Sequence, residues 1–211
     1  MNRWQYLTFR ITLIIPVILM PNAHAGDYTL VPDEFIYCTT CHGVELRGNR
    51  LVDAPRLAGM EGWYAENQIR AFQKGWRGTH EQDFTGMEMR AQVIFLNDEQ
   101  IKDAIAFVTS VPIRTNRISP PTVTGDIEKG KALYATCAAC HGRHGEGNQA
   151  NRAPALVGRS DWYLVRQLQK FRIGVRGYAS ADTLGKRMRA ASALLKDADA
   201  IESVVAYINT L

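Results

Sequence analysis

The residues most able to do chemistry are two cysteine pairs, each with two residues between the thiols and a histidine directly after the second. The chain of 211 residues has four cysteines, and these motifs use all of them. A C-x-x-C-H motif is typical of c-type heme attachment. Two thiols at this spacing can add across the two vinyl groups of one heme while the adjacent imidazole coordinates the iron. The predicted attachment thiols are Cys38, Cys41, Cys137 and Cys140, and the predicted histidine ligands are His42 and His141.

Other uses of paired cysteines fit these motifs less well. Four cysteines in an exported chain would usually suggest disulfides, but disulfides need no histidine behind each pair. A redox-active C-x-x-C pair needs none either. A zinc site could use two C-x-x-C pairs, although again without a histidine fixed to both. We therefore predict two covalently bound hemes c.

The sequence around the first motif recurs around the second, and Cys137 follows Cys38 by 99 residues. After Leu96 and Leu195 the register slips by one, so the closing segments align at an offset of 100. Two repeats are too few for a solenoid, which indicates duplication of one domain. Matching pairs at the offset of 99 include Gly43 and Gly142, Pro55 and Pro154, Trp63 and Trp162, Tyr64 and Tyr163, Gln68 and Gln167, Arg77 and Arg176, and Asp83 and Asp182.

The first 25 residues have the pattern of a cleaved export signal. Residues 1–10 carry two arginines and no acid, residues 11–20 are apolar, and Ala23 and Ala25 occupy the positions that a signal peptidase reads. The apolar run is about half of the ~20 residues that a membrane span needs. We expect cleavage after Ala25 rather than an uncleaved anchor.

The remaining chain divides into domain 1 (residues 26–111), a linker (112–125) and domain 2 (126–211). Prolines bracket the linker and stop the helix before it. Asp126 is a plausible N-cap for the next helix. The pattern predicts an all-α fold in which a helix leads into each cysteine motif. A second helix covers residues 63–74 in the first half and 161–173 in the second. A loop carrying methionine and a final amphipathic helix follow, with no convincing strands.

A methionine at the same distance from each histidine is the predicted second iron ligand. Met89 and Met188 each lie 47 residues after their histidine, within Gly-x-x-Met. A loop methionine is often only apolar filler, but recurrence in both halves favours ligation. The alternatives do not recur at equivalent positions: they are Met87, Met60, His80 and His144.

Other repeated residues have two readings each. Pro55 and Pro154 lie where a nearby carbonyl could accept the histidine Nδ1–H. Arg77 and Arg176 could pair with heme propionates or be solvated loop residues. The repeated aromatic residues could contact heme or a propionate, or could be ordinary core residues; these are Trp63, Tyr64, Trp162 and Tyr163.

The two halves differ near their heme motifs. The first half has only residues 28–37, with Pro32 among them, as a leading segment before its cysteine motif, so we expect a short leading helix and a more exposed first heme. Val44-Glu45-Leu46 aligns with Arg143-His144-Gly145. A cation disfavours the oxidised, more positive heme, so Arg143 should raise the potential of the second heme, and exposure should lower that of the first.

These motifs together resemble the diheme class I cytochromes c of the cytochrome c4 family. The resemblance covers both halves and rests on C-x-x-C-H-G, P-x-L-x-G, W-Y-x-x-x-Q, R-G and G-x-x-M. It implies two tandem class I cytochrome c domains, each wrapped around one covalently bound heme with histidine and methionine ligands. It also implies an electron carrier in the periplasm.

The function expected is electron transfer in a respiratory chain. The donor would be a dehydrogenase or quinol-oxidising complex, the acceptor a terminal oxidase or reductase, with peripheral membrane association as an option. A dedicated heme subunit of a dehydrogenase or oxidase complex is the alternative. An enzyme is disfavoured because it would need a labile iron position or a cysteine ligand, whereas two methionine ligands are predicted and all four thiols are used for attachment. A sensor is disfavoured because it would normally carry an output domain, which the pattern does not indicate. Without residues 1–25 the chain has 23 basic and 21 acidic residues, which gives no reason to expect nucleic-acid binding.

Overall fold

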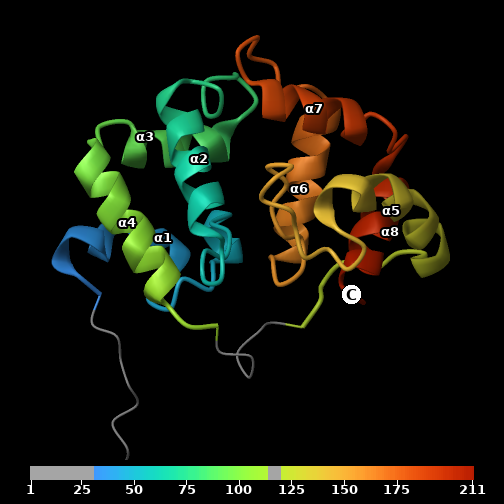
Figure 1. Cartoon of the computed structure of the whole chain (residues 1–211), viewed down its shortest axis with the longest axis horizontal. Coiled ribbons are helices and arrows are strands. Elements are labelled where there is room, and N and C mark those ends of the chain that lie inside the picture. The colour runs from blue at the N-terminus through green and yellow to red at the C-terminus, as the bar shows by residue number, and fades with distance from the viewer. Residues whose placement is uncertain (1–30, 114–119) are drawn as a thin grey trace, which may run out of the picture. The chain divides into compact units, whose positions relative to one another are not determined.

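The computed structural model describes residues 31–113 and 120–211 (Figure 1). The predicted signal peptide and most of the linker's first half therefore lie outside the described residues. Within the described ranges the regular secondary structure is helical, apart from isolated bridges that join Asn49 to Ala54 and Asn148 to Ala153. The all-α prediction is confirmed. No helix in these ranges is long and apolar enough to cross a membrane.

The helices follow the sequence repeat. In the first half they are α1 (Ile36–His42), α2 (Gly62–Gln73), α3 (Phe84–Val93) and α4 (Asp98–Ser110), with short 3-10 turns at Asp33–Phe35 and Arg50–Val52. In the second half they are α5 (Ile127–His141), α6 (Asp161–Arg172), α7 (Thr183–Ser192) and α8 (Ala198–Ile208). The bounds of α2 and α6, and of α3 and α7, differ by the 99 residues of the repeat, and α8 begins 100 residues after α4.

The leading helices differ in length as predicted. Pro32 caps the 3-10 turn before α1, and α1 has seven residues. By contrast α5 has 15 residues, and the Asp126 side chain caps it by accepting a hydrogen bond of 2.9 Å from the Lys129 backbone N–H. This is the N-cap expected from the sequence.

The prediction that the methionines lie on loops is wrong. Met89 lies within α3 and Met188 within α7. An aspartate stands at the N-cap of each helix, and the Asp182 side chain accepts a hydrogen bond of 2.8 Å from the Gly185 backbone N–H. Because such a cap satisfies an otherwise unpaired N–H of the first turn, it favours a helix at this point.

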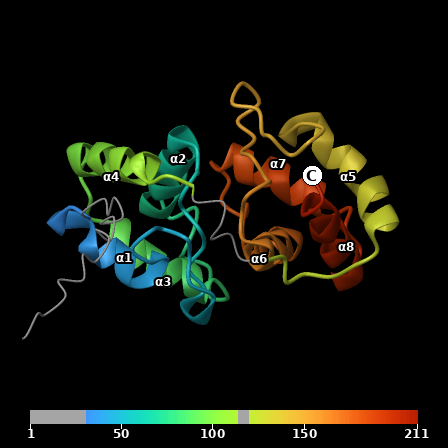
Figure 2. The ribbon, with the colours of Figure 1, turned by 90° about the horizontal axis from the view of Figure 1, so that it is seen from below.

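Each half packs its last helix against its earlier ones. Phe35 stacks on Phe107 with ring centroids 5.3 Å apart, and the equivalent Tyr134 and Tyr207 are 5.4 Å apart. In the first half α2 also packs on α3 and α4, and in the second α6 packs on α7 and α8. Figures 1 and 2 both show α5 beside α8. The core of each half is therefore built from equivalent elements.

The contact between α5 and α8 is very close at one glycine. A Cβ atom at Gly130 would lie 2.0 Å from the carbonyl oxygen of Ser203, so this position cannot carry a side chain without displacement of a helix. The equivalent residue of the first half is Val31. Residues Val31–Leu211 form one compact unit.

Candidate cofactor sites

Each predicted histidine ligand is held in one orientation by a backbone carbonyl. His42 and His141 end α1 and α5, and both side chains are buried. The Nδ1 of His42 lies 2.7 Å from the carbonyl oxygen of Pro55, and that of His141 lies 2.7 Å from that of Pro154. Because a carbonyl only accepts, Nδ1 carries the proton and Nε2 keeps its lone pair for a metal. The expected role of these prolines is confirmed.

The surroundings of both rings favour the neutral imidazole. Burial lowers the pKa of His42 and of His141, since charge is disfavoured away from water, although the proline carbonyl opposes this effect in each case. A neutral imidazole is the form that coordinates metal ions. The two histidines therefore share the same carbonyl contact and the same preferred protonation state.

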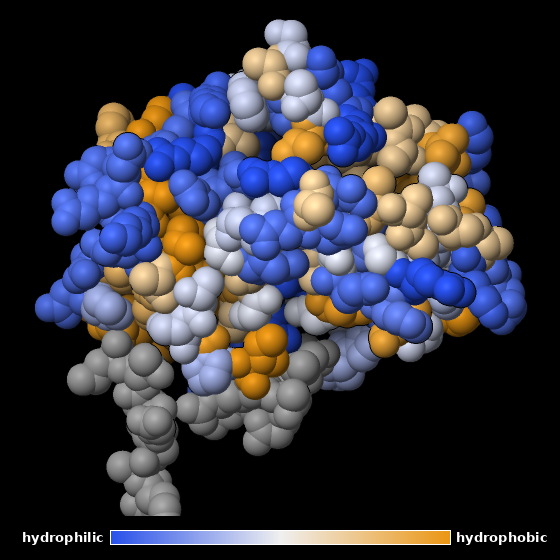
Figure 3. Space-filling model, viewed as in Figure 1, coloured by the Kyte–Doolittle hydropathy of each residue, from blue (hydrophilic) through white to orange (hydrophobic). Residues whose placement is uncertain are grey.

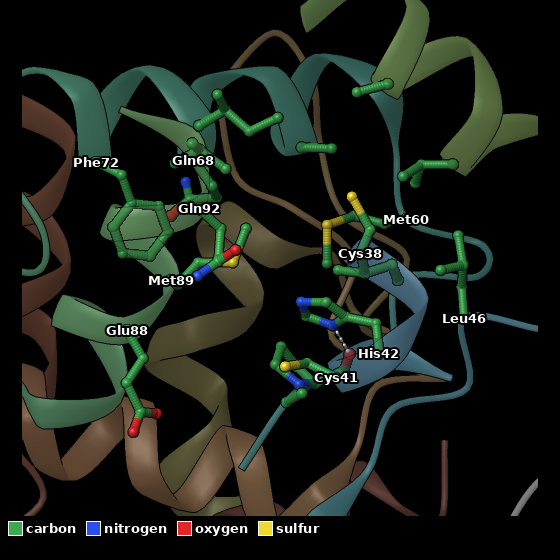
Figure 4. A pocket seen from close by; sticks show the side chains of 18 of the residues that line it. Cys38, Cys41, His42, Leu46, Met60, Gln68, Phe72, Glu88, Met89 and Gln92 are labelled. Carbon is green, nitrogen blue, oxygen red and sulfur yellow. Dashed lines mark hydrogen bonds between the residues drawn. The ribbon is translucent and has the colours of Figure 1, made fainter. Parts of the chain in front are cut away.

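A cavity of about 440 Å³ lies beside His42, and Cys38, Cys41 and Met89 are among its lining residues. Figure 4 shows Cys38, Cys41 and His42 on one side and Met89 on the opposite side. Most of the other lining side chains are apolar or aromatic. An apolar cavity with two thiols and an imidazole on one wall and a thioether on the other fits a covalently attached heme.

The alternative ligands of the first half lie elsewhere. Met87 is exposed on α3, and Met60 lies next to Cys38, on the histidine side of the cavity (Figure 4). His80 packs edge-on against Tyr178 with ring centroids 5.5 Å apart, and its Nδ1 accepts a hydrogen bond from the Gln82 backbone N–H. In the second half His144 is exposed. These positions favour Met89 over its rivals.

The repeated arginines are not solvated loop residues. Arg77 and Arg176 are both buried, and each guanidinium lies 4.2 Å from the ring centroid of Phe72 or Phe171. Each also donates to the glutamine of its own half, from Arg77 to Gln68 over 2.8 Å and from Arg176 to Gln167 over 2.7 Å.

One arginine donor at the first cavity is still without a protein acceptor. Arg77 lines the cavity, and its buried Nε has no hydrogen-bond partner. An unpaired buried guanidinium N–H is costly unless an acceptor reaches it. A heme propionate at the cavity edge would supply that acceptor. The residues present therefore fit a heme at this site.

The repeated aromatic residues divide into two groups. Tyr64 lines the first cavity, whereas Arg152 stacks over Trp63 at 5.5 Å and Trp162 lies beside the linker residues Thr122–Thr124. Tyr163 belongs to the second half, yet it lines the cavity of the first half and accepts a hydrogen bond of 3.3 Å from Arg77. The sequence offered no sign that this tyrosine crosses to the other half.

The contacts between the halves pair equivalent positions. The Ala155 backbone N–H donates to Glu61 over 2.7 Å, and the equivalent Arg56 N–H donates to Ser160, the counterpart of Glu61, over 3.4 Å. Thr79 hydrogen-bonds to Tyr178, its own counterpart. Such reciprocal contacts are those of an isologous interface, in which the same surface is used on both sides.

Other contacts between the halves are ion pairs in which at least one partner does not recur in the repeat. A search for residues that are identical in both halves does not find these ion pairs. The sign that could have found them is a charged residue in one half whose aligned residue in the other half is of a different kind. The pairs are Arg159 with Glu61 at 3.2 Å, Lys170 with Asp83 at 2.5 Å, and Arg166 with Asp53.

Comparison with known proteins extends this picture. A family model described as cytochrome c matches residues 34–112 and 127–211. Cytochrome c4 of Azotobacter vinelandii is 29% identical over 208 residues, which cover 92% of this chain and 96% of that protein. The thiosulfate dehydrogenase electron acceptor of Stutzerimonas stutzeri (strain A1501) is 29% identical over 178 residues, with coverages of 81% and 76%.

Two solved structures are similar in fold. Reduced recombinant cytochrome c4 from Pseudomonas stutzeri superposes with a TM-score of 0.63 and 27% identity, covering 84% of this chain and 95% of that one. Thiosulfate dehydrogenase from Marichromatium purpuratum superposes with a TM-score of 0.63 and 28% identity, and the match covers 82% of this chain but 36% of that longer one.

Proposed function

The chain belongs to the cytochrome c family, as a diheme cytochrome of the cytochrome c4 type, and from this premise we propose that it carries electrons between redox partners in the periplasm. It binds two hemes c covalently and transfers electrons without being an enzyme. The hemes supply one-electron chemistry, and the protein supplies attachment, ligands and environment. Export would follow from cleavage of residues 1–25 after Ala25, leaving domain 1 (26–111), a linker (112–125) and domain 2 (126–211).

In this proposal each half would attach its own heme and would supply two iron ligands. Cys38 and Cys41 bind the first heme and Cys137 and Cys140 the second. His42 and Met89 coordinate the first iron, and His141 and Met188 the second. Methionine opposite histidine raises the reduction potential.

The observation that carries the assignment is the geometry of the first cavity. His42 presents Nε2 because the Pro55 carbonyl holds Nδ1, and Met89 lines the wall opposite. The same histidine contact recurs at Pro154 with the same length. An iron held between an imidazole and a thioether can change charge by one electron without losing or gaining a ligand, which suits a carrier.

The methionine assignment is tested with the variants Met89→Leu and Met188→Leu. In the oxidised holoprotein each variant should remove about half of the long-wavelength sulfur-to-iron absorption band, because one of two thioether ligands is lost. Each should also lower one of the two reduction potentials, since methionine ligation raises the potential. An unchanged band in both variants would contradict the assignment.

The partners define a second candidate, a dedicated heme subunit of a dehydrogenase. It is favoured by the similarity to a thiosulfate dehydrogenase electron acceptor and to one part of a longer thiosulfate dehydrogenase chain. The free carrier is supported by the full-length similarity to cytochrome c4. Chromatography of a native periplasmic extract separates the two. A free carrier elutes at its own mass, whereas a subunit elutes with a catalytic partner.

A further inference from the structure

One ion pair joins the second half to the helix of the first half that carries Met89. Lys170, on α6, places its Nζ 2.5 Å from Oδ1 of Asp83 and 2.8 Å from Oγ1 of Thr85. The Lys170 side chain is 13% exposed and that of Asp83 is 1% exposed. Charge-assisted hydrogen bonds between groups this well buried are among the stronger polar contacts in a protein.

Asp83 is fully engaged around this contact. Its second oxygen, Oδ2, accepts a hydrogen bond of 3.0 Å from the Gly78 backbone N–H. Burial alone would raise the pKa of the Asp83 carboxyl, but the Lys170 ammonium and the Gly78 N–H hold the pKa below its ordinary value. The carboxylate therefore stays charged and links α6, the loop at Gly78 and the start of α3.

The second half has a different arrangement at the same place. There Asp182 accepts from the Gly185 backbone N–H and so caps its own helix, α7. The residue of the first half that aligns with Lys170 is Ala71, which has no charge to offer Asp182. The start of α3 is thus tied to the other half by an ion pair, whereas the start of α7 is capped locally.

The tie acts on a short helix that is also fixed near its other end. Met89 lies six residues after Asp83, less than two helical turns. Directly after Met89, Arg90 donates from Nε to the Phe72 carbonyl over 3.1 Å. Met89 is therefore held between one contact within its own half and one contact that comes from the second half.

We propose that Lys170 is a positioning residue for the first heme, holding Met89 on the iron through Asp83 and α3. This inference rests on the proposed ligation by Met89. Ligand groups keep their geometry only when neighbouring residues fix the element that carries them, and outer contacts of this kind tune metal sites strongly. Removal of Lys170 weakens Met89 as a ligand and leaves Met188 unaffected.

The experiment measures how readily an added ligand replaces methionine. Imidazole is titrated into the oxidised holoprotein of the wild type and of Lys170→Met, which keeps the side-chain length and removes the charge. We expect imidazole to bind one heme at least about tenfold more tightly in the variant, the effect of losing one strong polar contact. The sulfur-to-iron band should fall by up to half as it binds.

Two controls separate positioning from general stability. Lys170→Arg keeps the charge and should restore resistance to imidazole. Lys129→Met removes an exposed ion pair with Asp199 in the second half and should leave imidazole binding unchanged. The affected heme is identified by comparison with Met89→Leu, whose remaining band and potentials belong to the second heme.

If Lys170→Met accumulates poorly because it leaves Asp83 buried without its cation, the double variant Lys170→Met, Asp83→Asn removes that charge and should show the same increase. An unchanged imidazole affinity in both forms, or an equal change at both hemes, would overturn the inference while Met89 ligation stands. If Met89→Leu leaves the sulfur-to-iron band intact, the ligation itself fails and the inference fails with it.

Discussion

The two halves of this chain agree closely where the histidines are held and differ at equivalent positions on the surface. Each imidazole is held in the same orientation because its Nδ1 lies 2.7 Å from a proline carbonyl oxygen. At the surface, however, Val44 is 64% exposed where the second half has Arg143, and Leu51 is 95% exposed where it has Ala150. Attachment and ligation constrain the interior of a heme domain, and leave its surface free to diverge.

The thiols show the same contrast on a smaller scale. Cys41 is exposed, whereas its counterpart Cys140 is half-buried. The helix before the first site, α1, has seven residues, whereas α5 before the second has 15. The exposure of Cys41 and the shorter α1 agree with the prediction that the first heme is the more exposed one. On the face shown in Figure 3, apolar residues lie among polar ones over both halves. The following experiments test how far the likeness of the halves extends.

The largest expected effect is loss of a whole heme. Cys38→Ala with Cys41→Ala should give a chain whose intact mass corresponds to one heme, and Cys137→Ala with Cys140→Ala should do the same, because each thiol pair serves one heme. The wild type should have the mass of the chain from Gly26 plus two hemes. If either double variant kept two covalent hemes, the assignment of one heme to each cysteine pair would be wrong.

A smaller effect should separate the halves at the crossing of α5 and α8. Gly130→Val places a side chain where a Cβ already meets the Ser203 carbonyl at 2.0 Å, so we expect a loss of about 3 kcal/mol in the free energy of unfolding. The matched change Val31→Ala, at the equivalent position, should cost only about 1 kcal/mol. Denaturant unfolding followed by circular dichroism measures both, and equal losses would show that the first half packs as tightly at this point.

The acid response should depend on a carboxylate present in one half only. Asp161 accepts hydrogen bonds from the Thr122 and Val123 backbone N–H groups, and its counterpart is Gly62. Burial would raise the pKa of Asp161, but these N–H donors hold it below its ordinary value. A depressed pKa adds stability above the ordinary value of ~4, and that stability is lost as the pH falls through the folded-state pKa.

Asp161→Asn should therefore lower the free energy of unfolding by about 1–2 kcal/mol at pH 7, because weaker acceptors replace the carboxylate. The difference between variant and wild type should shrink as the medium becomes acidic, since the wild-type carboxylate is then protonated. Urea unfolding over a pH series measures this. A difference that does not change with pH would mean that the charge of Asp161 is unimportant.

The smallest expected effect concerns the two potentials. Arg143→Leu should lower the higher potential slightly, because a nearby cation disfavours the oxidised heme, and the shift should diminish at high salt since Arg143 is exposed. Redox titration of both forms measures it. If the two hemes titrate at one potential, or if only the lower potential shifts, the proposal that the second heme has the higher potential is wrong.

Much of this architecture follows from local sequence pattern. The repeat predicted equivalent helices, Pro32 predicted a short leading helix, and Asp126 predicted an N-cap, and the structure confirms all three. The methionines were misplaced on loops, although an aspartate stands at the N-cap position before each of them. Such signals lie within a few residues of the feature that they specify.

The contacts between the halves could not be predicted in this way. Tyr163 reaches the cavity of the first half and Lys170 reaches Asp83, and each pair is separated by more than 80 residues. Their formation depends on how two folded surfaces meet, which no local period encodes. The sign in the sequence that could have been used is a difference between aligned residues of the two halves, such as Lys170 where the first half has Ala71.

The reciprocal contacts at Glu61 and Ser160, and at Thr79 and Tyr178, have the geometry of a symmetric homodimer built within one polypeptide. In a homodimer every substitution appears twice, so both sites must change together. Covalent fusion removes that restriction, and a lysine at position 170 can appear without a second lysine at position 71. Gene duplication thereby lets one iron site be altered while its twin is left as it was.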